Sequence, residues 1–176
     1  NGPTYASETT SQTVKVIGTT RTIGFWQTHT AFTSSVFALP TMQKYVGVAP
    51  SKGVITNDNP SQLFGGFYAP IAKKTTGAKR TPIDQARIQM LQQLLAAKLN
   101  CAGFGCSSAT TTLIAQADAA YAAGANKNLI ISLAGQLDTF NNSGDANAIP
   151  VELPATGKAT PTASKAIANL GFWNTP

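Results

Sequence analysis

The segment from residue 81 to residue 100 constrains the fold more than any other part of the chain. Its apolar residues recur at three- and four-residue intervals, the spacing of the buried stripe of an amphipathic helix. The residues of this stripe are Ile88, Leu91, Leu94, Leu95 and Leu99. Thr81 can cap the first turn, Pro82 is tolerated within that turn, and Asp84 completes a variant of the capping box. The segment therefore predicts a helix whose apolar face other elements must cover.

Two later segments carry the same helical pattern. We predict one helix from about residue 108 to residue 123, ending at Gly124, and another from about residue 126 to residue 141, stopping at Gly144. Short loops join these helices to the one before them. The pattern predicts a mainly α fold with a minor β part, in which about three to four helices form a compact bundle.

The rest of the chain is less regular. Residues 23–39 suit one face of a helix beginning near Trp26, and a short helix can form over residues 163–170. Prolines and a Gly-Gly pair interrupt residues 40–80, so we expect irregular structure there, with a short strand at residues 53–56. This Pro- and Gly-rich middle segment is the natural place for a binding loop.

Residues 9–17 are rich in β-branched side chains that partly alternate, which predicts an extended N-terminal strand. The residues expected to pair and to be buried on assembly are Thr13, Val14, Val16 and Ile17. No hairpin partner follows them in the sequence. The strand must therefore pair with a distant strand or with another molecule, because an unpaired edge invites strand addition.

The chain divides into an N-terminal arm at residues 1–20, a helical core domain at residues 21–145, and a linker with an aromatic tail at residues 146–176. The tail contains Phe172 and Trp173, and it repeats the Gly-Phe-Trp order found near residue 25. Two interpretations stay open: the repeat is a coincidence, or the terminal aromatic pair docks into a neighbouring subunit. In either case we expect Trp173 to be buried, since an indole left in water is unfavourable.

Charged residues make up only 11% of the 176 residues, against roughly 25% in ordinary soluble domains. Such a surface suits packing against copies of the same chain or against a polymer, because little charge must be desolvated on contact. The alternative is an exported protein whose low-charge surface does not self-associate.

Much of the net charge of +6 falls in one stretch of the middle segment. The residues of this basic patch are Lys73, Lys74, Lys79 and Arg80. The patch can bind an anionic polysaccharide through screened electrostatics, or it can be a solvated loop without a partner. No aromatic residue for base stacking lies among the basic residues, which argues against a nucleic-acid partner.

Cys101 and Cys106 are the two cysteines, and two glycines between them allow the sulfurs to approach. We predict a local disulfide and hence an oxidising compartment, with a pair of buried free thiols as the alternative. Two cysteines fall short of the roughly four ligands that structural zinc requires. No apolar run approaches the roughly 20 residues of a membrane span, so we expect none.

The chain has one histidine and seven carboxylates, few groups for acid–base chemistry. We interpret His29 as a hydrogen-bonded structural residue beside Trp26; a small hydrolase would instead depend on it. We therefore predict that the protein is not an enzyme and has no cofactor. Asp138, Asn141 and Asp145 lie around a tight turn and are a weak candidate for calcium, with ordinary helix capping as the competing interpretation.

Gly24, Phe25, Trp26 and His29 form a Gly-aromatic-Trp-x-x-His segment, which lies upstream of the sequence Leu-Leu-Ala-Ala-x-Leu-Asn at residues 94–100. This combination resembles a loosely defined group of secreted bacterial proteins, over roughly residues 21–145. The resemblance implies an exported protein of the cell surface or extracellular matrix with no settled activity. In this chain a threonine follows the histidine, where proline is common in the group.

These observations lead to two functional hypotheses. The first is an extracellular structural subunit that self-assembles into a filament or surface layer by donating its N-terminal strand to another copy of the chain. The second is a monomeric secreted module that binds polysaccharide or another anionic partner through the basic patch. Both place the protein outside the cell or at its surface.

Overall fold

The computed structural model describes residues 18–48 and 60–176. The predicted strand at residues 9–17, with Thr13, Val14, Val16 and Ile17, and the predicted strand at residues 53–56 lie outside the described residues. The described residues form seven α-helices and one short 3-10 helix. They are α1 (Ile23–Thr28), α2 (Thr30–Phe37), α3 (Ser61–Tyr68), α4 (Pro82–Phe104), α5 (Ser108–Ala123), α6 (Lys127–Asn142), α7 (Pro161–Ile167) and η1 (Gly171–Asn174).

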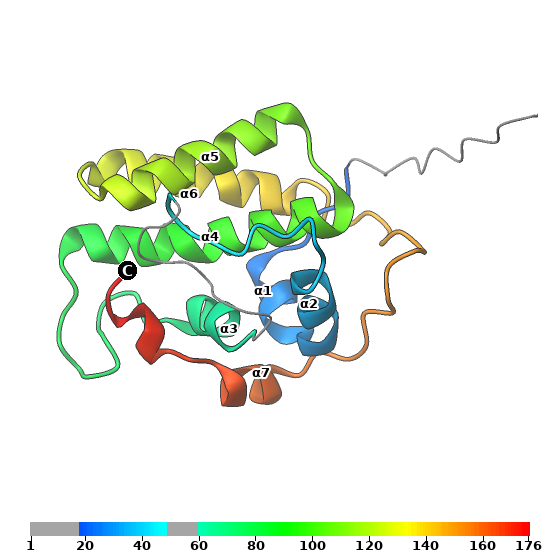
Figure 1. Cartoon of the computed structure of the whole chain (residues 1–176), viewed down its shortest axis with the longest axis horizontal. Coiled ribbons are helices and arrows are strands. Elements are labelled where there is room, and N and C mark those ends of the chain that lie inside the picture. Colours follow the sequence, from blue (N-terminus) through cyan, green and yellow to red (C-terminus); the bar gives the residue numbers. More distant parts are fainter. Residues whose placement is uncertain (1–17, 49–59) are drawn as a thin grey trace, which may run out of the picture.

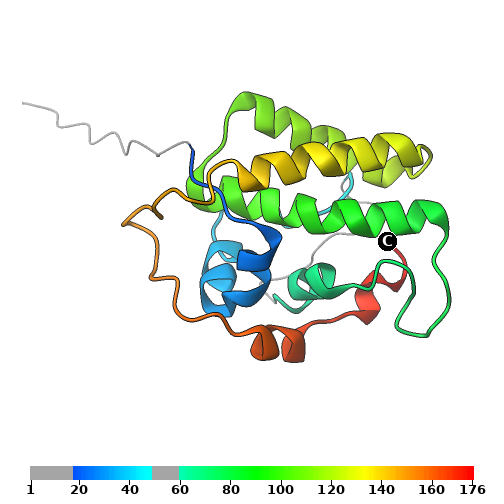
Figure 2. The same ribbon diagram turned by 180° about the vertical axis from the view of Figure 1, so that it is seen from behind.

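Helix α4 lies in the middle of the fold. Figures 1 and 2 show α5 and α6 along one side of it and α1, α2, α3 and α7 on the other. Seven consecutive residues, 94–100, are buried, so α4 is covered on more than the single stripe that its sequence predicts. The predicted mainly helical fold is confirmed for the described residues. Among residues 18–48 and 60–176, no helix combines the length and apolarity that a bilayer crossing requires.

The three helices with the clearest sequence pattern form as expected. The Thr81 side chain accepts a hydrogen bond from the Asp84 amide at 3.1 Å, and Pro82 opens α4. Gly124 closes α5 in the left-handed conformation, at φ 56°, which glycine adopts without strain. Helix α6 runs one residue later than predicted at both ends, and α4 continues four residues beyond Asn100.

Two segments differ from the sequence expectation. The region predicted to hold one helix near Trp26 contains two, because the chain breaks at His29, whose backbone lies at φ −90° and ψ 67°. Helix α3 forms within the middle segment that we expected to be irregular. Gly65 and Gly66 weaken its intrinsic helical propensity, but the C-terminal chain packs directly against them, so tertiary packing outweighs local preference.

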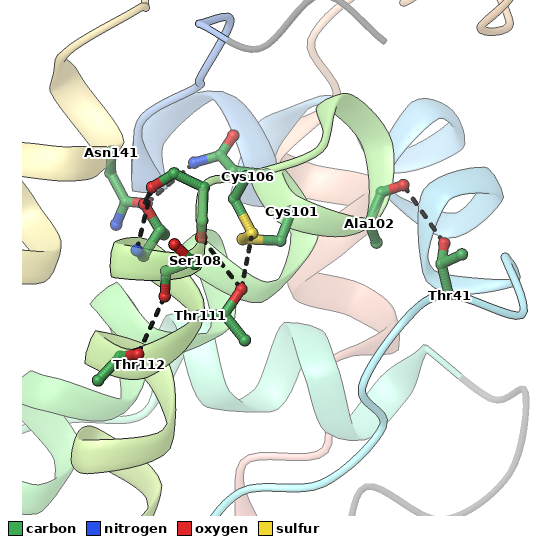
Figure 3. The surroundings of a disulfide bond; sticks show 11 residues. Thr41, Cys101, Ala102, Cys106, Ser108, Thr111, Thr112 and Asn141 are labelled. Carbon is green, nitrogen blue, oxygen red and sulfur yellow. Dashed lines mark hydrogen bonds between the residues drawn. A yellow bond between two sulfur atoms is a disulfide. The ribbon is translucent and has the colours of Figure 1, made fainter. Parts of the chain in front are cut away.

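The predicted disulfide between Cys101 and Cys106 is present, with the two Cα atoms 4.9 Å apart, and the alternative of two free thiols is wrong. The bond connects the last turn of α4 to the residue before the cap of α5. Figure 3 shows Thr111 beside the Cys106 sulfur and Thr41 donating to the Ala102 carbonyl. The disulfide therefore closes the turn between the two helices.

A buried ion pair also holds α4 to α5. The Lys98 ammonium lies 2.7 Å from a carboxylate oxygen of Asp118, and it donates to the Tyr45 carbonyl as well. The backbone amide of Gly47 donates to the same carboxylate at 2.9 Å. Burial lowers the pKa of Lys98 and raises that of Asp118, against the attraction between the two charges. The hydrogen bonds fix the 45–47 loop on the bundle.

Candidate assembly site

The described chain begins at a short segment, Gly18–Arg21, which we call the arm root because the predicted N-terminal strand precedes it. The root lies against the turn that follows α6. The Thr20 amide donates to the Gly144 carbonyl at 3.2 Å, and the Gly144 amide donates back to the Thr20 hydroxyl at 2.8 Å. The Asn147 side chain donates to the Gly18 carbonyl at 2.6 Å. These bonds pair two segments that are more than 120 residues apart in the sequence.

Gly144 allows this close approach. A Cβ atom at Gly144 would lie 1.8 Å from the Gly18 carbonyl oxygen and 2.9 Å from the Thr20 nitrogen. Both neighbours are backbone atoms, which cannot rotate away as a flexible side chain can. The sequence identifies Gly144 only as a helix stop, whereas in the structure it is also the contact surface for the arm root.

The Arg21 guanidinium holds the same turn from the other side. Its Nη1 atom donates to the Thr20 carbonyl at 2.7 Å and to the Asp145 carbonyl at 2.9 Å. Its Nη2 atom donates to the Asn147 carbonyl at 2.7 Å. The side chain is 9% exposed, and its positive charge is stabilised here by backbone carbonyl dipoles. Arg21 thus binds several carbonyls of one turn at once.

A network of buried amides connects the root to the core. The Asn100 carbonyl oxygen accepts from the Arg21 amide at 2.7 Å and from the Trp26 indole at 3.1 Å. The Asn100 amide group donates to the Arg21 carbonyl and to Asn141, both at 2.9 Å. Asn141 in turn donates to the backbone of Gln93. Asn100 belongs to α4 and Asn141 to α6, so the root is hydrogen-bonded to α4 directly and is connected to α6 through Asn100.

The Gly-Phe-Trp-x-x-His motif forms α1, immediately after the root. Trp26 is fully buried, and Gly24 is exposed. The His29 ring stacks on Phe25 with centroids 3.9 Å apart, and its Nδ1 atom lies 3.0 Å from the Phe25 carbonyl oxygen. The ring therefore makes the structural hydrogen bond that we expected, although it stacks on Phe25 instead of Trp26.

The C-terminal aromatic pair lies on the same side of α4 as α1, next to α3. Trp173 is 1% exposed, which confirms that it is buried, and its indole donates to the Gln62 carbonyl at 2.7 Å. The ring edge lies 3.4 Å from the position a Cβ atom would take at Gly66. Phe172 is half-buried beside it. In this structure the pair packs on its own chain.

The predicted basic patch separates into two parts. Lys73 and Lys79 are exposed and face each other across an isolated antiparallel bridge, with Lys74 partly exposed between them. Arg80 is 3% exposed, so it adds little charge to this surface. Its guanidinium donates instead to the carbonyls of Pro70 at 3.0 Å and Trp173 at 2.9 Å. Burial lowers the pKa of Arg80, against the attraction of nearby Asp84.

The three calcium candidates have separate partners. The Asn141 amide oxygen accepts from Asn100, and the Asp138 carboxylate accepts from Gln93 at 2.7 Å. The Asp145 carbonyl accepts from the Arg21 guanidinium, whose positive charge opposes a bound cation. In the part of the chain that the structure describes, no three acidic, histidine or cysteine residues gather as a metal site.

Sequence reasoning missed the residues that fix the root, namely Arg21, Asn100 and Gly144. A signal for Asn100 is present, because an amide next to the apolar stripe of a buried helix must find hydrogen-bond partners. Arg21 and Gly144 carry no comparable local signal, since their partners are distant in the sequence. Comparison of the chain with protein-family models, with curated proteins and with solved structures finds no match.

Proposed function

We propose that this protein is an extracellular structural subunit that self-assembles, with the strand predicted at residues 9–17 pairing with a neighbouring copy. The observation that carries the proposal is the attachment of the arm root. Gly18 and Arg21, the two ends of the root, are both hydrogen-bonded to the turn at residues 144–147. Asn100 also bonds Arg21 to α4. A donated strand can hold two subunits together only when its own end is fixed in the donor.

Two features outside the root support an extracellular structural role. The disulfide between Cys101 and Cys106 persists in oxidising compartments and is uncommon in reducing ones. The chain also has only seven acidic residues, and among the described ones Asp84 and Asp118 form ion pairs within the subunit. A surface with few charges loses little hydration energy when copies pack together.

Strand donation needs no external energy source. Added strands gain main-chain hydrogen bonds along the acceptor edge. Burial of Val14, Val16 and Ile17 would contribute about 1.5 to 3 kcal/mol for each side chain that becomes fully covered. Together these contributions oppose the entropy lost when the arm becomes ordered. That entropy loss is smaller when one end of the arm is already fixed at the root.

The proposal is tested by removing residues 1–17, which leaves the root intact. We expect the truncated chain to be a monomer, smaller than the 18.3 kDa of one full chain, while the full chain forms large particles in light scattering and negative-stain microscopy. A truncated chain that forms the same particles would reject strand donation.

A glycine pair tests the role of the root itself. Gly144→Ala places a methyl group against the Gly18 carbonyl and should displace the root, so we expect weaker assembly. Gly135→Ala is the matched control, because no atom lies within 4 Å of a Cβ at that position on α6. Equal assembly by both variants would show that attachment of the root to the turn is not needed for assembly.

A second function is binding of an anionic polysaccharide by residues 73–79, which we call the basic loop. It is favoured by hydrogen bonds that fix this loop to the C-terminal chain. The Thr75 amide donates to the Asn174 side chain at 2.9 Å, and Asn174 donates back to the Thr75 hydroxyl at 2.7 Å. This contact orders the loop that presents Lys73 and Lys79, which lowers the entropy lost on binding.

The loop hypothesis predicts a change in salt-dependent retention on a sulfated polysaccharide column. Replacing Lys73, Lys74 and Lys79 by glutamine should lower the salt concentration needed for elution, because fewer counterions are released on binding. Lys158→Gln is the control, since Lys158 is exposed in the linker away from this loop. Identical elution of the two variants would reject the loop as a binding site.

A further inference from the structure

Residues 160–176, which we call the C-terminal segment, contain α7 and η1 and lie across α3 and the basic loop. We call this receiving surface, residues 61–80, the seat. Figure 2 shows the segment running along the edge of the fold, apart from α5 and α6. The segment packs on α3 through both α7 and η1. Helix α7 also packs on α1 and α2, and Thr160 before it is hydrogen-bonded to Thr28 and Thr30. The segment therefore lies on the seat and, at its beginning, on α1 and α2.

Hydrogen bonds to the main chain fix the segment in the seat. The Asn169 amide donates to the Ser61 carbonyl at 2.8 Å, and the Trp173 indole donates to the Gln62 carbonyl at 2.7 Å. At the other end, Arg80 donates to the Trp173 carbonyl. Main-chain bonds of this kind define the path and register of the segment.

The seat is shaped for this segment by two adjacent glycines. A Cβ atom at Gly65 would lie 2.2 Å from the Asn169 carbonyl oxygen, and one at Gly66 would lie 3.4 Å from the Trp173 ring. A larger residue at position 65 would exclude the segment, whereas one at position 66 would first meet the Leu95 side chain, 2.5 Å away. Because α3 accepts glycine here despite its low helical propensity, the surface fits this particular sequence, residues 160–176.

The connection to the segment is much less firmly held. Within the described chain, residues 154–159 make no hydrogen bond, and all of them except Thr156 are exposed. Pro154 favours an extended backbone, and Gly157 lies at φ 66°. A connection of six residues spans up to about 20 Å when extended. It can therefore follow a different path without loss of a hydrogen bond to the described part of the domain.

We propose that the C-terminal segment exchanges between copies and occupies the seat of a second molecule. The contacts of the segment are the same in its own seat and in a neighbour's, so the two arrangements differ only in the path of residues 154–159. Because the exchanged form joins two molecules, its population depends on protein concentration. High local concentration, as in an assembly, favours the exchanged form. This interface goes beyond strand donation, because its contacts are made by described residues and by none of residues 1–17.

Complementation between two full-length variants tests the exchange. In the first, Gly65→Ala blocks the seat and leaves the segment intact; in the second, Trp173→Asp disables the segment and leaves the seat open. Trp26 is buried in both, so Trp173 of the first variant is the indole that acrylamide quenches strongly. We expect mixing to remove that quenching, because the intact segment enters the open seat.

Residues 1–17 contain no tryptophan, so this measurement does not respond to strand donation. A chain carrying both substitutions, mixed with the Gly65→Ala variant, is the control: Trp173 is present but both seats are blocked, so mixing should cause no change. Quenching of the first mixture that equals the average of its components would overturn the exchange, provided that circular dichroism shows both variants helical.

A shortened connection decides the question if either variant fails to fold. Deleting residues 155–158 from the otherwise unchanged chain shortens the connection from six residues to two, and we expect the segment then to fall short of its own seat. We expect Trp173 to stay protected from acrylamide at high protein concentration and to become quenchable on dilution, as an intermolecular contact requires. Quenching that is the same at every concentration would overturn the proposal.

Discussion

The two Gly-Phe-Trp segments, one following the arm root and one near the C-terminus, are locally alike and are held differently. Trp26 and Trp173 are both buried, and both indoles donate to a backbone carbonyl. An arginine beside each segment binds backbone carbonyls, Arg21 at the root and Arg80 at the seat. The same local chemistry thus occurs at two separate places on the side of α4 away from α5 and α6.

The difference lies in what the central helices contribute. The Trp26 indole also donates to Asn100 of α4, which is itself bonded to Asn141 of α6. Trp173 bonds to the short helix α3, and the Arg80 Nη2 atom is buried without a hydrogen-bond partner. The first segment is bonded to the core of the bundle and is a fixed anchor. The second packs on a peripheral helix and follows an exposed connection, so it is suited to release and exchange.

The largest expected effect is at the anchor. Asn100→Leu removes the acceptor for the Arg21 amide and leaves several buried polar groups unpaired, so we expect a loss of about 3 to 5 kcal/mol in the free energy of unfolding. Gln89→Leu, at an exposed position on the same helix, should change it by less than about 0.5 kcal/mol. Urea denaturation measures both. Similar small losses would show that the amide network does not hold the root.

Replacing each tryptophan by phenylalanine compares the two sides directly. Trp26→Phe removes an indole that donates to both Arg21 and Asn100, and we expect it to cost about 2 kcal/mol. Trp173→Phe removes one bond to Gln62 and should cost about 1 kcal/mol. Thermal unfolding followed by circular dichroism gives the order. The reverse order would contradict the distinction between an anchor and a releasable segment.

The parts of the fold that sequence predicts well are those specified by neighbouring residues. Thr81, Pro82 and Gly124 mark helix ends through local hydrogen bonds and backbone geometry, and the observed helices begin or end beside them. The pairing of Cys101 with Cys106 is local for the same reason, since the loop between them is short.

The parts that sequence does not predict depend on distant partners. Arg21 and Asn100 are 79 positions apart, so nothing near either residue announces the bond between them. Arg80 resembles the neighbouring lysines in sequence, yet it is buried because the Trp173 carbonyl supplies an acceptor. Helix α3 is missed because its Gly-Gly pair lowers the local helical propensity, and the close packing that requires small residues there is made by the distant C-terminal chain. The predicted strand at residues 9–17 stays a prediction.

The smallest expected effect concerns Tyr121, which lies near the end of α5 beside Arg87 of α4. Its buried hydroxyl has no hydrogen-bond partner among the described residues. Tyr121→Phe should leave stability unchanged or raise it by about 1 kcal/mol, because no bond is lost. Tyr68→Phe, the control, loses hydrogen bonds to Gln27 and to Ser164 of the C-terminal segment and should cost about 1 kcal/mol. Equal losses in urea denaturation would mean that the Tyr121 hydroxyl is as well bonded as that of Tyr68.

Alkaline pH sharpens the same test. Burial raises the pKa of Tyr121, so the folded chain keeps this proton at a pH where the unfolded chain, with a tyrosine pKa of about 10, releases it. The stability contributed by the protonated group is therefore complete below pH of about 10 and declines as the pH rises further. Tyr121→Phe should lose stability less steeply than the unaltered chain in that range. Parallel pH profiles would show that the Tyr121 hydroxyl ionises as easily in the folded chain as in the unfolded one. The surroundings of Tyr121 would then be more open to water than those of the anchor.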